Sequence, residues 1–379
     1  MHIAIVANGF QEDYIVDLLN SIAGKAEKID FIGSSFYPRE KIDTRINILD
    51  FRGEHTEDVA LWYKINRMLL YYSKLLRYIV GRNATVIHVQ WLRFNFLEGV
   101  FFTLLARSLG IKVVYTAHDV LPHMKDNIYN RIVFYIIYHL QNQIIVHTEF
   151  IYNRLMKEFK VPDSKLSLVK HGVYQVKENK AVNKTLAKSS FGLKELDKVI
   201  LFFGIITKYK GLDILLKAFQ EFRKYKSDYY LVIAGHVAIE YKSNFEKIIV
   251  QYNNSNIIKQ LQYIEDDEME YLFKAADVIV LPYLEASQSG VLFMSYAYGR
   301  PVIAPKLGGF PHDIINQKTG LLFTPGDPDS LLETLKEFDI LFPDFFAESE
   351  AFIKQYVNEN YSWESSGKEL IKTYTSIIS

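Results

Sequence analysis

Residues 277–304 read Asp277-Val-Ile-Val-Leu-Pro-Tyr-Leu-Glu-Ala-Ser-Gln-Ser-Gly290-Val-Leu-Phe-Met-Ser-Tyr-Ala-Tyr-Gly299-Arg-Pro-Val-Ile-Ala304. A short β-branched run, a loop of small residues, a helix-length segment, a Gly-Arg-Pro turn and a second β-branched run follow one another. This order predicts a strand, a helix and a parallel strand. Because the loop opens a helix, its unpaired backbone N–H groups predict an anion site. An ordinary capped helix start is the alternative.

The same alternation runs along the whole chain. Most of the predicted strands are continuous apolar runs, as expected for a parallel sheet that is buried on both faces. They cover residues 2–7, 29–33, 46–51, 85–89, 112–117, 143–147 and 166–170, then 199–204, 230–234, 258–262, 278–281, 301–304 and 321–323.

A polar, lysine-rich stretch divides these strands into two groups. We therefore predict an α/β protein with two Rossmann-like, doubly wound domains that face each other across a cleft. The domains cover residues 1–174 and 199–360, with a linker at 175–198. Residues 361–379 are expected to form a helix that returns toward the first domain.

Composition narrows the class of protein. The 379 residues hold 44 Lys plus Arg, 44 Asp plus Glu and no cysteine. Zero net charge argues against nucleic acid as a partner, and the lack of cysteine excludes disulfides and thiolate chemistry. Since neither a signal peptide nor a membrane-spanning run is visible, we expect a cytoplasmic protein.

A second loop carries lysines. Residues 202–211 read Phe-Phe-Gly-Ile-Ile-Thr-Lys208-Tyr-Lys210-Gly211 and lead into an amphipathic helix. Lysines at the end of a strand suit a diphosphate, although solvated loop lysines are the alternative. The acidic run at 265–268 begins a helix, which favours helix capping over a metal site.

Together these loops resemble the nucleotide-sugar-dependent glycosyltransferases of family 4 (glycosyl transferases group 1), which have the GT-B fold. The order and spacing of the motifs carry the resemblance, more specifically in the second half than in the first. The matching residues are Gly204 with Lys210-Gly211, Ala234-Gly235, Ala276-Asp-Val with Pro282, Gly299 to Ala304, Gly308-Gly-Phe-Pro311, Thr319-Gly320 and Pro325-Gly-Asp, and in the first half Asn8-Gly9, Thr116-Ala-His118-Asp119 and Lys170-His-Gly-Val173.

The resemblance implies an enzyme that moves a sugar, a hexose above all, from a UDP- or GDP-sugar to a glycan or lipid-linked acceptor. It implies retention of configuration, no metal or further cofactor, and a pathway that builds cell-surface polysaccharide or glycolipid. The first domain would bind the acceptor and the second the donor. By resemblance, His118 lies over the transferred sugar, Gly9 leaves room for the diphosphate, Lys210 holds the diphosphate, Gln288 and Ser289 face the sugar, and Gly290 and Val291 face the phosphates.

The chain departs from the family where a Glu-x7-Glu pair is expected, because Ala286 and Met294 occupy those positions. Glu285, displaced by one residue, is the candidate to reach the sugar hydroxyls. Met294 stands where relatives hold the ribose, and a thioether is a weak acceptor. Ile205 replaces a basic residue, which makes Lys208 its candidate substitute.

Three other functions are alternatives to sugar transfer. The lost Glu pair leaves open a catalytically degenerate protein that binds a glycan or a nucleotide, and the fold also suits a nucleotide-sugar epimerase. A nicotinamide dehydrogenase is disfavoured, because Asn8-Gly9-Phe10 follows the first strand in place of Gly-x-Gly-x-x-Gly.

Residues 63–82 hold five basic residues and no acidic one. Their spacing predicts an amphipathic helix, suited either to an anionic inner-membrane surface or to packing on its own sheet. The predicted apolar face is Ile65, Leu69, Tyr72, Leu76 and Ile79, and the predicted outer face is Lys64, Arg67, Tyr71, Lys74, Arg77 and Tyr78.

Overall fold

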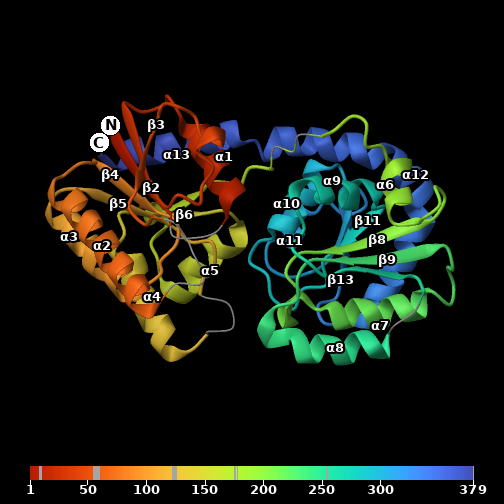
Figure 1. Ribbon diagram of the computed structural model, residues 1–379. Coiled ribbons are helices and arrows are strands. Elements are labelled where there is room, and N and C mark those ends of the chain that lie inside the picture. The colour runs from red at the N-terminus through yellow and green to blue at the C-terminus, as the bar shows by residue number, and fades with distance from the viewer. Residues whose placement is uncertain are drawn as a thin grey trace. The chain divides into compact units, whose positions relative to one another are not determined.

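The computed structural model describes residues 1–7, 11–53, 60–121, 126–174, 176, 178–252 and 255–378, without the side chains of residues 266 and 342–347. The chain forms two compact units (Figure 1). The first combines Met1–Gly172 with Tyr361–Ser379, and the second is Val173–Asn360. Each is an α/β unit around a parallel sheet.

The first unit contains a seven-stranded parallel sheet in the order β3-β2-β1-β4-β5-β6-β7. The predicted strands are confirmed to within about two residues at each end. They are β1 (His2–Val6), β2 (Lys28–Gly33), β3 (Ile46–Asp50), β4 (Val86–Val89), β5 (Lys112–Thr116), β6 (Gln143–Val146) and β7 (Leu166–Leu168).

Helices cover both faces of this sheet. Side chains of α1 and α13 share one hydrophobic cluster with Ile3, Ile5 and Val114. Those of α2 to α5 pack on the opposite face, against residues such as Val113 and Ile144. The bounds are α1 (Glu12–Ile22), α2 (Leu61–Val80), the π-helix η2 (Leu97–Phe102), α3 (Thr103–Ser108), α4 (Ile128–Leu140), α5 (Glu149–Phe159) and α13 (Trp363–Ile378).

The C-terminal helix α13 is part of the first unit. Its Tyr374 hydroxyl lies 2.6 Å from Nδ1 of His88, which is fully buried in the sheet. Gly172 lies against the ring of Trp363, where an added Cβ would come within 2.4 Å of ring carbons. Residues far apart in the chain therefore complete a single core.

The predicted helix at residues 63–82 is confirmed, but of its predicted apolar face only Ile79 is buried and Tyr72 partly buried. The buried residues of α2 are Tyr71, Leu75, Tyr78 and Ile79. Tyr78 buries its ring because its hydroxyl donates to Asp30 at 2.6 Å, which satisfies its polar tip. Helical rotation then leaves aliphatic side chains such as Leu69 in solvent, with 59% of that residue exposed.

The second unit contains a six-stranded parallel sheet in the order β10-β9-β8-β11-β12-β13. Here too the predicted strands are confirmed. They are β8 (Lys198–Phe203), β9 (Tyr229–Ala234), β10 (Ile257–Gln260), β11 (Val278–Val280), β12 (Val302–Pro305) and β13 (Gly320–Phe323). The helices are α6 (Lys184–Ser190), α7 (Leu212–Phe222), α8 (Lys242–Gln251), α9 (Asp266–Ala275), α10 (Gly290–Ala297), α11 (Phe310–Asp313) and α12 (Pro328–Asn360).

The stretch at 175–198, which the sequence suggested to be a linker, belongs to the second unit. Its helix α6 carries Lys184, whose ammonium lies 2.5 Å from the buried carboxylate of Asp277 at the start of β11. Burial outweighs this attraction and lowers the pKa of Lys184 to about 8.

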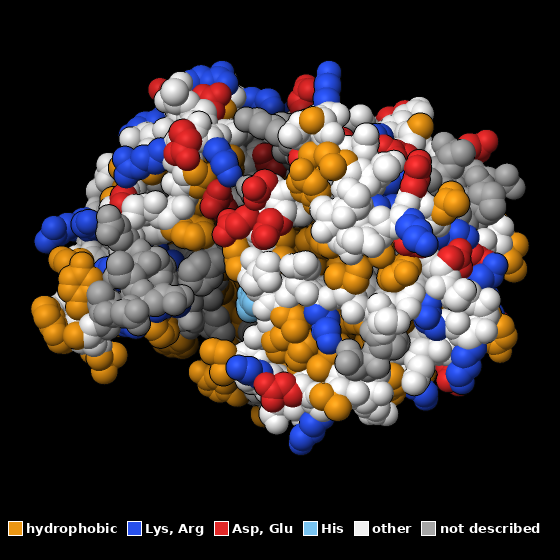
Figure 2. Space-filling model, turned by 45° about the vertical axis from the view of Figure 1, so that its right-hand side comes forward, with side chains coloured by type: hydrophobic (Ala, Val, Ile, Leu, Met, Phe, Trp, Pro, Cys, Tyr) orange, Lys and Arg blue, Asp and Glu red, His pale blue; other side chains and the backbone are white. Residues whose placement is uncertain are grey.

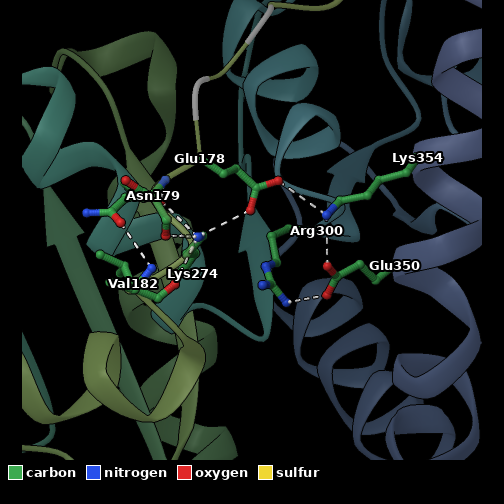
Figure 3. Close-up of polar contacts among 9 residues, drawn as sticks. Glu178, Asn179, Val182, Lys274, Arg300, Glu350 and Lys354 are labelled. Carbon is green, nitrogen blue, oxygen red and sulfur yellow. Dashed lines mark hydrogen bonds and ion pairs between the residues drawn. The ribbon is translucent and has the colours of Figure 1, made fainter.

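A charge cluster holds the start of this stretch (Figure 3). The carboxylate of Glu178 points between two ammonium groups, 3.2 Å from Lys274 on α9 and 3.3 Å from Lys354 on α12. Lys274 also donates to the carbonyls of Asn179 and Val182, at 3.1 and 2.9 Å. These contacts fix the chain between the first unit and α6 to the body of the second.

The acidic run at 265–268 caps a helix, as predicted. The backbone N–H of Glu265 donates to the carboxylate of Glu268 at 3.1 Å, at the start of α9. Within the described ranges, no helix combines the length and the apolar character needed to cross a membrane.

Candidate functional site

Glycines bring the carboxyl ends of the central strands of the second unit together. Gly204 and Gly235 follow β8 and β9 with φ of 111° and 129°, and a Cβ on Gly235 would lie 2.1 Å from the carbonyl oxygen of Gly204. Gly211, with φ of 66°, lies so close to the loop after β11 that its Cβ would stand 1.9 Å from the carbonyl oxygen of Pro282. Only glycine fits these positions, so the two predicted loops are held side by side.

Lys210 is fixed against the loop after β11. It ends the 3-10 helix η4 (Lys208–Lys210), and its ammonium donates to the Tyr283 hydroxyl at 2.6 Å. The same ammonium lies 3.8 Å from the centroid of the Tyr283 ring, a cation–π contact. Burial lowers the pKa of Lys210 to about 8, so the group is still cationic at neutral pH.

The Tyr283 hydroxyl connects Lys210 to the N-terminus of α10. It lies 3.4 Å from the hydroxyl of Ser289, the N-cap residue, whose oxygen accepts from the N–H of Leu292. Gly290 and Val291 are the first residues of this helix, so their N–H groups belong to its positive end. The Lys210 ammonium and the N-terminus of α10 therefore both lie beside the Tyr283 hydroxyl. Two neighbouring positive groups of this kind suit a polyanion such as a diphosphate.

Two buried polar atoms add donors to this region. Among the described residues, neither Gln288 Nε2 nor Thr207 Oγ1 has a hydrogen-bond partner, although solvent does not reach either atom. Thr207 precedes η4 and Gln288 precedes the N-cap of α10. Because buried polar atoms normally have partners, these two are free to bind a polar ligand.

A fourth glycine fixes the loop that carries Glu285. Gly308, with φ of 60°, is packed so closely on the loop that its Cβ would lie 1.7 Å from the carbonyl oxygen of Ala286. Glu285 is exposed, and Met294 is partly exposed in the second turn of α10. The loop is thus held by backbone contacts while the Glu285 carboxylate remains open to solvent.

In the first unit, His118 follows β5 within a cluster of aromatic rings. It stacks on Trp91, with centroids 4.3 Å apart and planes 6° apart, and Tyr14 meets it edge-on at 5.2 Å. Burial and the neighbouring His147, His171 and His88 hold the pKa of His118 well below its usual range. Its Nε2 is buried without a partner among the described residues, so the neutral ring keeps one nitrogen for a ligand.

The other histidines of this cluster are engaged. His147 lies 3.0 Å from the Tyr14 hydroxyl through Nε2 and 2.7 Å from the Val169 carbonyl through Nδ1. Nδ1 of His171 lies against the carbonyl of Gly172. These contacts engage both rings within the fold, whereas Nε2 of His118 is left for a ligand.

Most of the predicted site residues come together in the second unit. Lys210, Gln288, Ser289, Gly290 and Val291 come together in the second unit, with Glu285 and Met294 on the same loop and helix. His118 lies in the first unit, and Gly9 lies outside the described residues. Lys208 is exposed at the start of η4.

Two tyrosines at the site, Tyr283 and Tyr174, were not predicted from the sequence. Tyr283 stood inside the quoted stretch, but an aromatic residue after a strand signals a core position as readily as a site. Tyr174 lies beyond the predicted strand at 166–170, yet its hydroxyl would be 3.0 Å from a Cβ on Gly290 at the start of α10. No local pattern marked this residue.

Comparison with protein families covers both units. Residues 11–174 match the model described as Glycosyltransferase Family 4, and residues 183–338 match the model described as Glycosyl transferases group 1. Apart from residues 173 and 174, the first match lies in the first unit, and the second lies in the unit that holds Lys210 and α10.

Individual relatives are more distant. An uncharacterized glycosyltransferase of Methanocaldococcus jannaschii is 25% identical over 237 residues, 61% of this chain and 59% of the relative. A D-inositol 3-phosphate glycosyltransferase of Pseudarthrobacter chlorophenolicus is 30% identical over 141 residues, 37% of this chain and 34% of the relative. The matches thus span roughly one third to three fifths of these curated relatives.

A solved structure shares the architecture over the full length. HepE of Anabaena, solved in complex with UDP-glucose, superposes with a TM-score of 0.78 at 14% identity, covering 99% of this chain and 100% of that one. At this identity the likeness establishes the fold, the GT-B fold with its two Rossmann-like sheets. With both family models matched along the chain, the protein belongs to glycosyltransferase family 4, the group 1 glycosyl transferases.

Proposed function

We propose that the protein transfers a sugar from a nucleotide-diphosphate sugar to a glycan or lipid-linked acceptor. The observation that carries the proposal is the Tyr283 hydroxyl, which joins the Lys210 ammonium to the N-terminus of α10. Family membership supports the reaction class, and the cation with its adjoining N–H groups supports a diphosphate as leaving group.

The chemistry follows from where charge develops. In glycosyl transfer the sugar becomes oxocarbenium-like while negative charge builds on the departing diphosphate. Lys210 and the N–H groups of Gly290 and Val291 are positioned before the reaction, so they stabilise that charge without reorganisation. One such donor is typically worth about 3 kcal/mol of transition-state energy.

We assign the remaining residues by their open polar groups. Gln288 Nε2 donates to the donor sugar, Glu285 accepts from its hydroxyls, and His118 supplies Nε2 as a further contact to the substrate. In a retaining reaction, the incoming acceptor hydroxyl forms the new bond and gives its proton to the departing phosphate. Neither a metal nor a further cofactor enters this scheme.

The donor class is a UDP- or GDP-hexose, and UDP-glucose is the first donor to test because HepE was solved with it. A lipid-linked acceptor would be met at the inner membrane face, by a cytoplasmic or peripheral enzyme of surface-polysaccharide or glycolipid synthesis. We place the acceptor in the first unit and the donor in the second.

A nucleotide-release screen tests the proposal. UDP-, GDP- and ADP-sugars are supplied with lipid-diphosphate acceptors, and released nucleotide is measured. Activity should appear in the wild type and vanish in Lys210→Ala, while Lys217→Ala, at an exposed lysine on α7, should behave like the wild type. Full activity in Lys210→Ala would reject this donor site.

The screen also separates the rivals. The changes at Ala286 and Met294 favour a non-catalytic binding protein as the second candidate, and such a protein would bind a nucleotide without ever releasing one from a sugar. An epimerase would convert the donor into an isomer without any acceptor.

A further inference from the structure

Helix α2 carries large apolar side chains on its solvent side. Among the described residues of this helix, the exposed fraction reaches 65% for Trp62, 59% for Leu69 and 54% for Val80. With Ile65 and Leu76, these residues form one stripe along the helix, because they recur at spacings of three, four, seven and eleven residues. This stripe lies beside the buried face of α2, and packing on the sheet does not cover it.

Neighbouring elements extend the apolar surface. Tyr72, at the edge of the stripe, contacts the rings of Phe94 and Phe102, at 6.2 and 5.8 Å between centroids, and so turns this side of α2 toward η2. Helix α3 packs beside α2, and η2 lies between α3 and α4. The exposed members are Phe94 and Phe96 just before η2, and on these elements Phe101, Leu104, Ile128, Tyr129, Ile132, Tyr135 and Ile136.

These elements cover the same face of the seven-stranded sheet, and α2, α3 and α4 appear as neighbours in Figure 1. Figure 2 shows exposed hydrophobic side chains gathered at the lower left of its view. Scattered apolar residues are normal on a protein surface, but a continuous patch across several helices marks an interaction site.

The charge of α2 indicates what the patch binds. The helix has no acidic residue, and its basic residues are Lys64, Arg67, Lys74 and Arg77. On the exposed side of the helix, Arg77 lies about 60° and Lys74 about 120° around the axis from Val80, so they border one edge of the apolar stripe. An apolar stripe with a tryptophan, bordered by Lys and Arg, is the pattern of a helix that lies in the interface of an anionic bilayer.

We propose that α2, with the exposed residues of η2, α3 and α4, docks the first unit on an anionic lipid bilayer. The apolar side chains enter the headgroup region, and the bordering basic residues pair with lipid phosphates. This docking depends on surface residues alone and needs no donor chemistry. Its failure would therefore leave the proposed transfer reaction intact, and the converse also holds.

Sedimentation with vesicles is the first test. The full-length wild type should bind vesicles of phosphatidylcholine with phosphatidylglycerol at low salt, and far less to phosphatidylcholine alone. Since each basic residue near such a surface contributes roughly fivefold in affinity, Lys74→Glu with Arg77→Glu should weaken binding at least tenfold. Both side chains are exposed, so folding should survive, which circular dichroism checks.

A charge-matched control decides whether the effect is local. Lys242→Glu with Lys247→Glu changes the net charge equally, at exposed positions on α8 in the second unit. This control should bind vesicles like the wild type. Equal weakening in both double variants, or unchanged binding in Lys74→Glu with Arg77→Glu, would overturn the proposal.

Tryptophan fluorescence tests the apolar half of the inference. Trp62 is one of three tryptophans and the only one on α2, so its emission should shift to the blue on anionic vesicles. The shift should disappear in Trp62→Phe. If the wild type binds vesicles with no contribution from Trp62, the contact is purely electrostatic and the proposal is refuted. If the protein instead dimerises through Leu69 without lipid, the surface is a protein–protein contact, which also refutes the proposal.

Discussion

Lys210 makes the proposed donor site sensitive to pH. Burial lowers its pKa from the usual 10.5 to about 8, so the ammonium is charged at neutral pH and loses its proton as the pH rises through 8. We expect kcat/KM to fall about tenfold per pH unit above that value. Bound diphosphate favours the charged ammonium of Lys210. The fall in kcat, which reports the enzyme with substrate bound, should therefore begin at a higher pH than the fall in kcat/KM.

A pH–rate profile between pH 6.5 and 10 checks this expectation. Lys210→Arg is the control, because a guanidinium stays protonated throughout and should carry its residual activity to higher pH. A wild-type kcat/KM that stays flat to pH 10 would contradict the assignment of Lys210.

Met294 offers a gain-of-function test on α10. The resemblance places the ribose of the donor near this position, where a thioether is a weak acceptor. Met294→Glu should tighten nucleoside diphosphate binding about tenfold, since a hydrogen bond to a charged acceptor is worth about 1.5–3 kcal/mol. Calorimetry should show no comparable gain for inorganic diphosphate, and an equal gain for both ligands would refute the ribose contact.

Individual site residues were predictable where the chain itself sets their place. Lys210 and Ser289 each sit at the start of a helix after a strand, and spacing is enough to find such positions. Tyr283 was not predicted, because its contact with Lys210 depends on the close approach of Gly211 to Pro282. These two residues lie on loops that are separate in the sequence. Burial of a tyrosine on α2 depended in the same way on Asp30, a partner from another strand.

Glycines at the ends of elements position the site, and Gly308 tests this role. In Gly308→Ala the new Cβ would lie 1.7 Å from the Ala286 carbonyl at a φ of 60°. We expect a loss of about 2–5 kcal/mol in the free energy of unfolding, together with weaker donor binding. Denaturant unfolding followed by circular dichroism measures the first effect.

Gly192→Ala is the matched control, because its φ of 70° is similar but no atom lies within 4 Å of the added Cβ. It should cost only the backbone strain of about 1–2 kcal/mol. Equal losses in the two variants would mean that the contact with the Ala286 loop is unimportant.

The strands were the part of this fold that the sequence predicted best. Parallel strands buried on both faces are continuous apolar runs, and each predicted run became a strand, from β1 to β13. The inner face of α2 was not predictable by the same rule, because periodicity ranks Leu69 above Tyr78 for burial. The structure buries Tyr78, whose hydroxyl has a partner, and exposes Leu69.

At the scale of the whole molecule, the histidine cluster makes the first unit sensitive to acid. Burial lowers the pKa of His147 to about 4 and those of His88 and His171 to about 3, below the 6.5 of an unfolded chain. These groups bind protons in the unfolded state first, so stability is present above pH 6.5 and is lost as the pH falls toward 4. Each contributes up to about 1.4 kcal/mol per pH unit in that window.

Tryptophan fluorescence can follow this loss in one unit, because Trp62, Trp91 and Trp363 all belong to the first. The free energy of unfolding should fall steadily between pH 6.5 and 4.5. His147→Gln should start lower at pH 7, yet lose less per pH unit than the wild type. An unchanged slope in that variant would show that His147 is not a buried neutral group.

The division into two units could be predicted from the sequence pattern. The unit to which the polar stretch 175–198 belongs could not. Residues 175–198 are rich in charge, which is typical of a linker, yet Glu178 and Lys184 find partners on α9, α12 and β11. Such pairs join residues more than 90 positions apart, and no local pattern records them.

The most direct test of the account is the affinity of the second unit's site for a nucleoside diphosphate. Calorimetric titration of the full-length protein with UDP and GDP would compare the wild type, Lys210→Met and the exposed-lysine control Lys217→Met. We expect at least one nucleotide to bind the wild type and Lys217→Met equally, and Lys210→Met at least tenfold more weakly. Equal affinity in Lys210→Met and the wild type would contradict the central claim that Lys210 and the N-terminus of α10 hold the donor diphosphate.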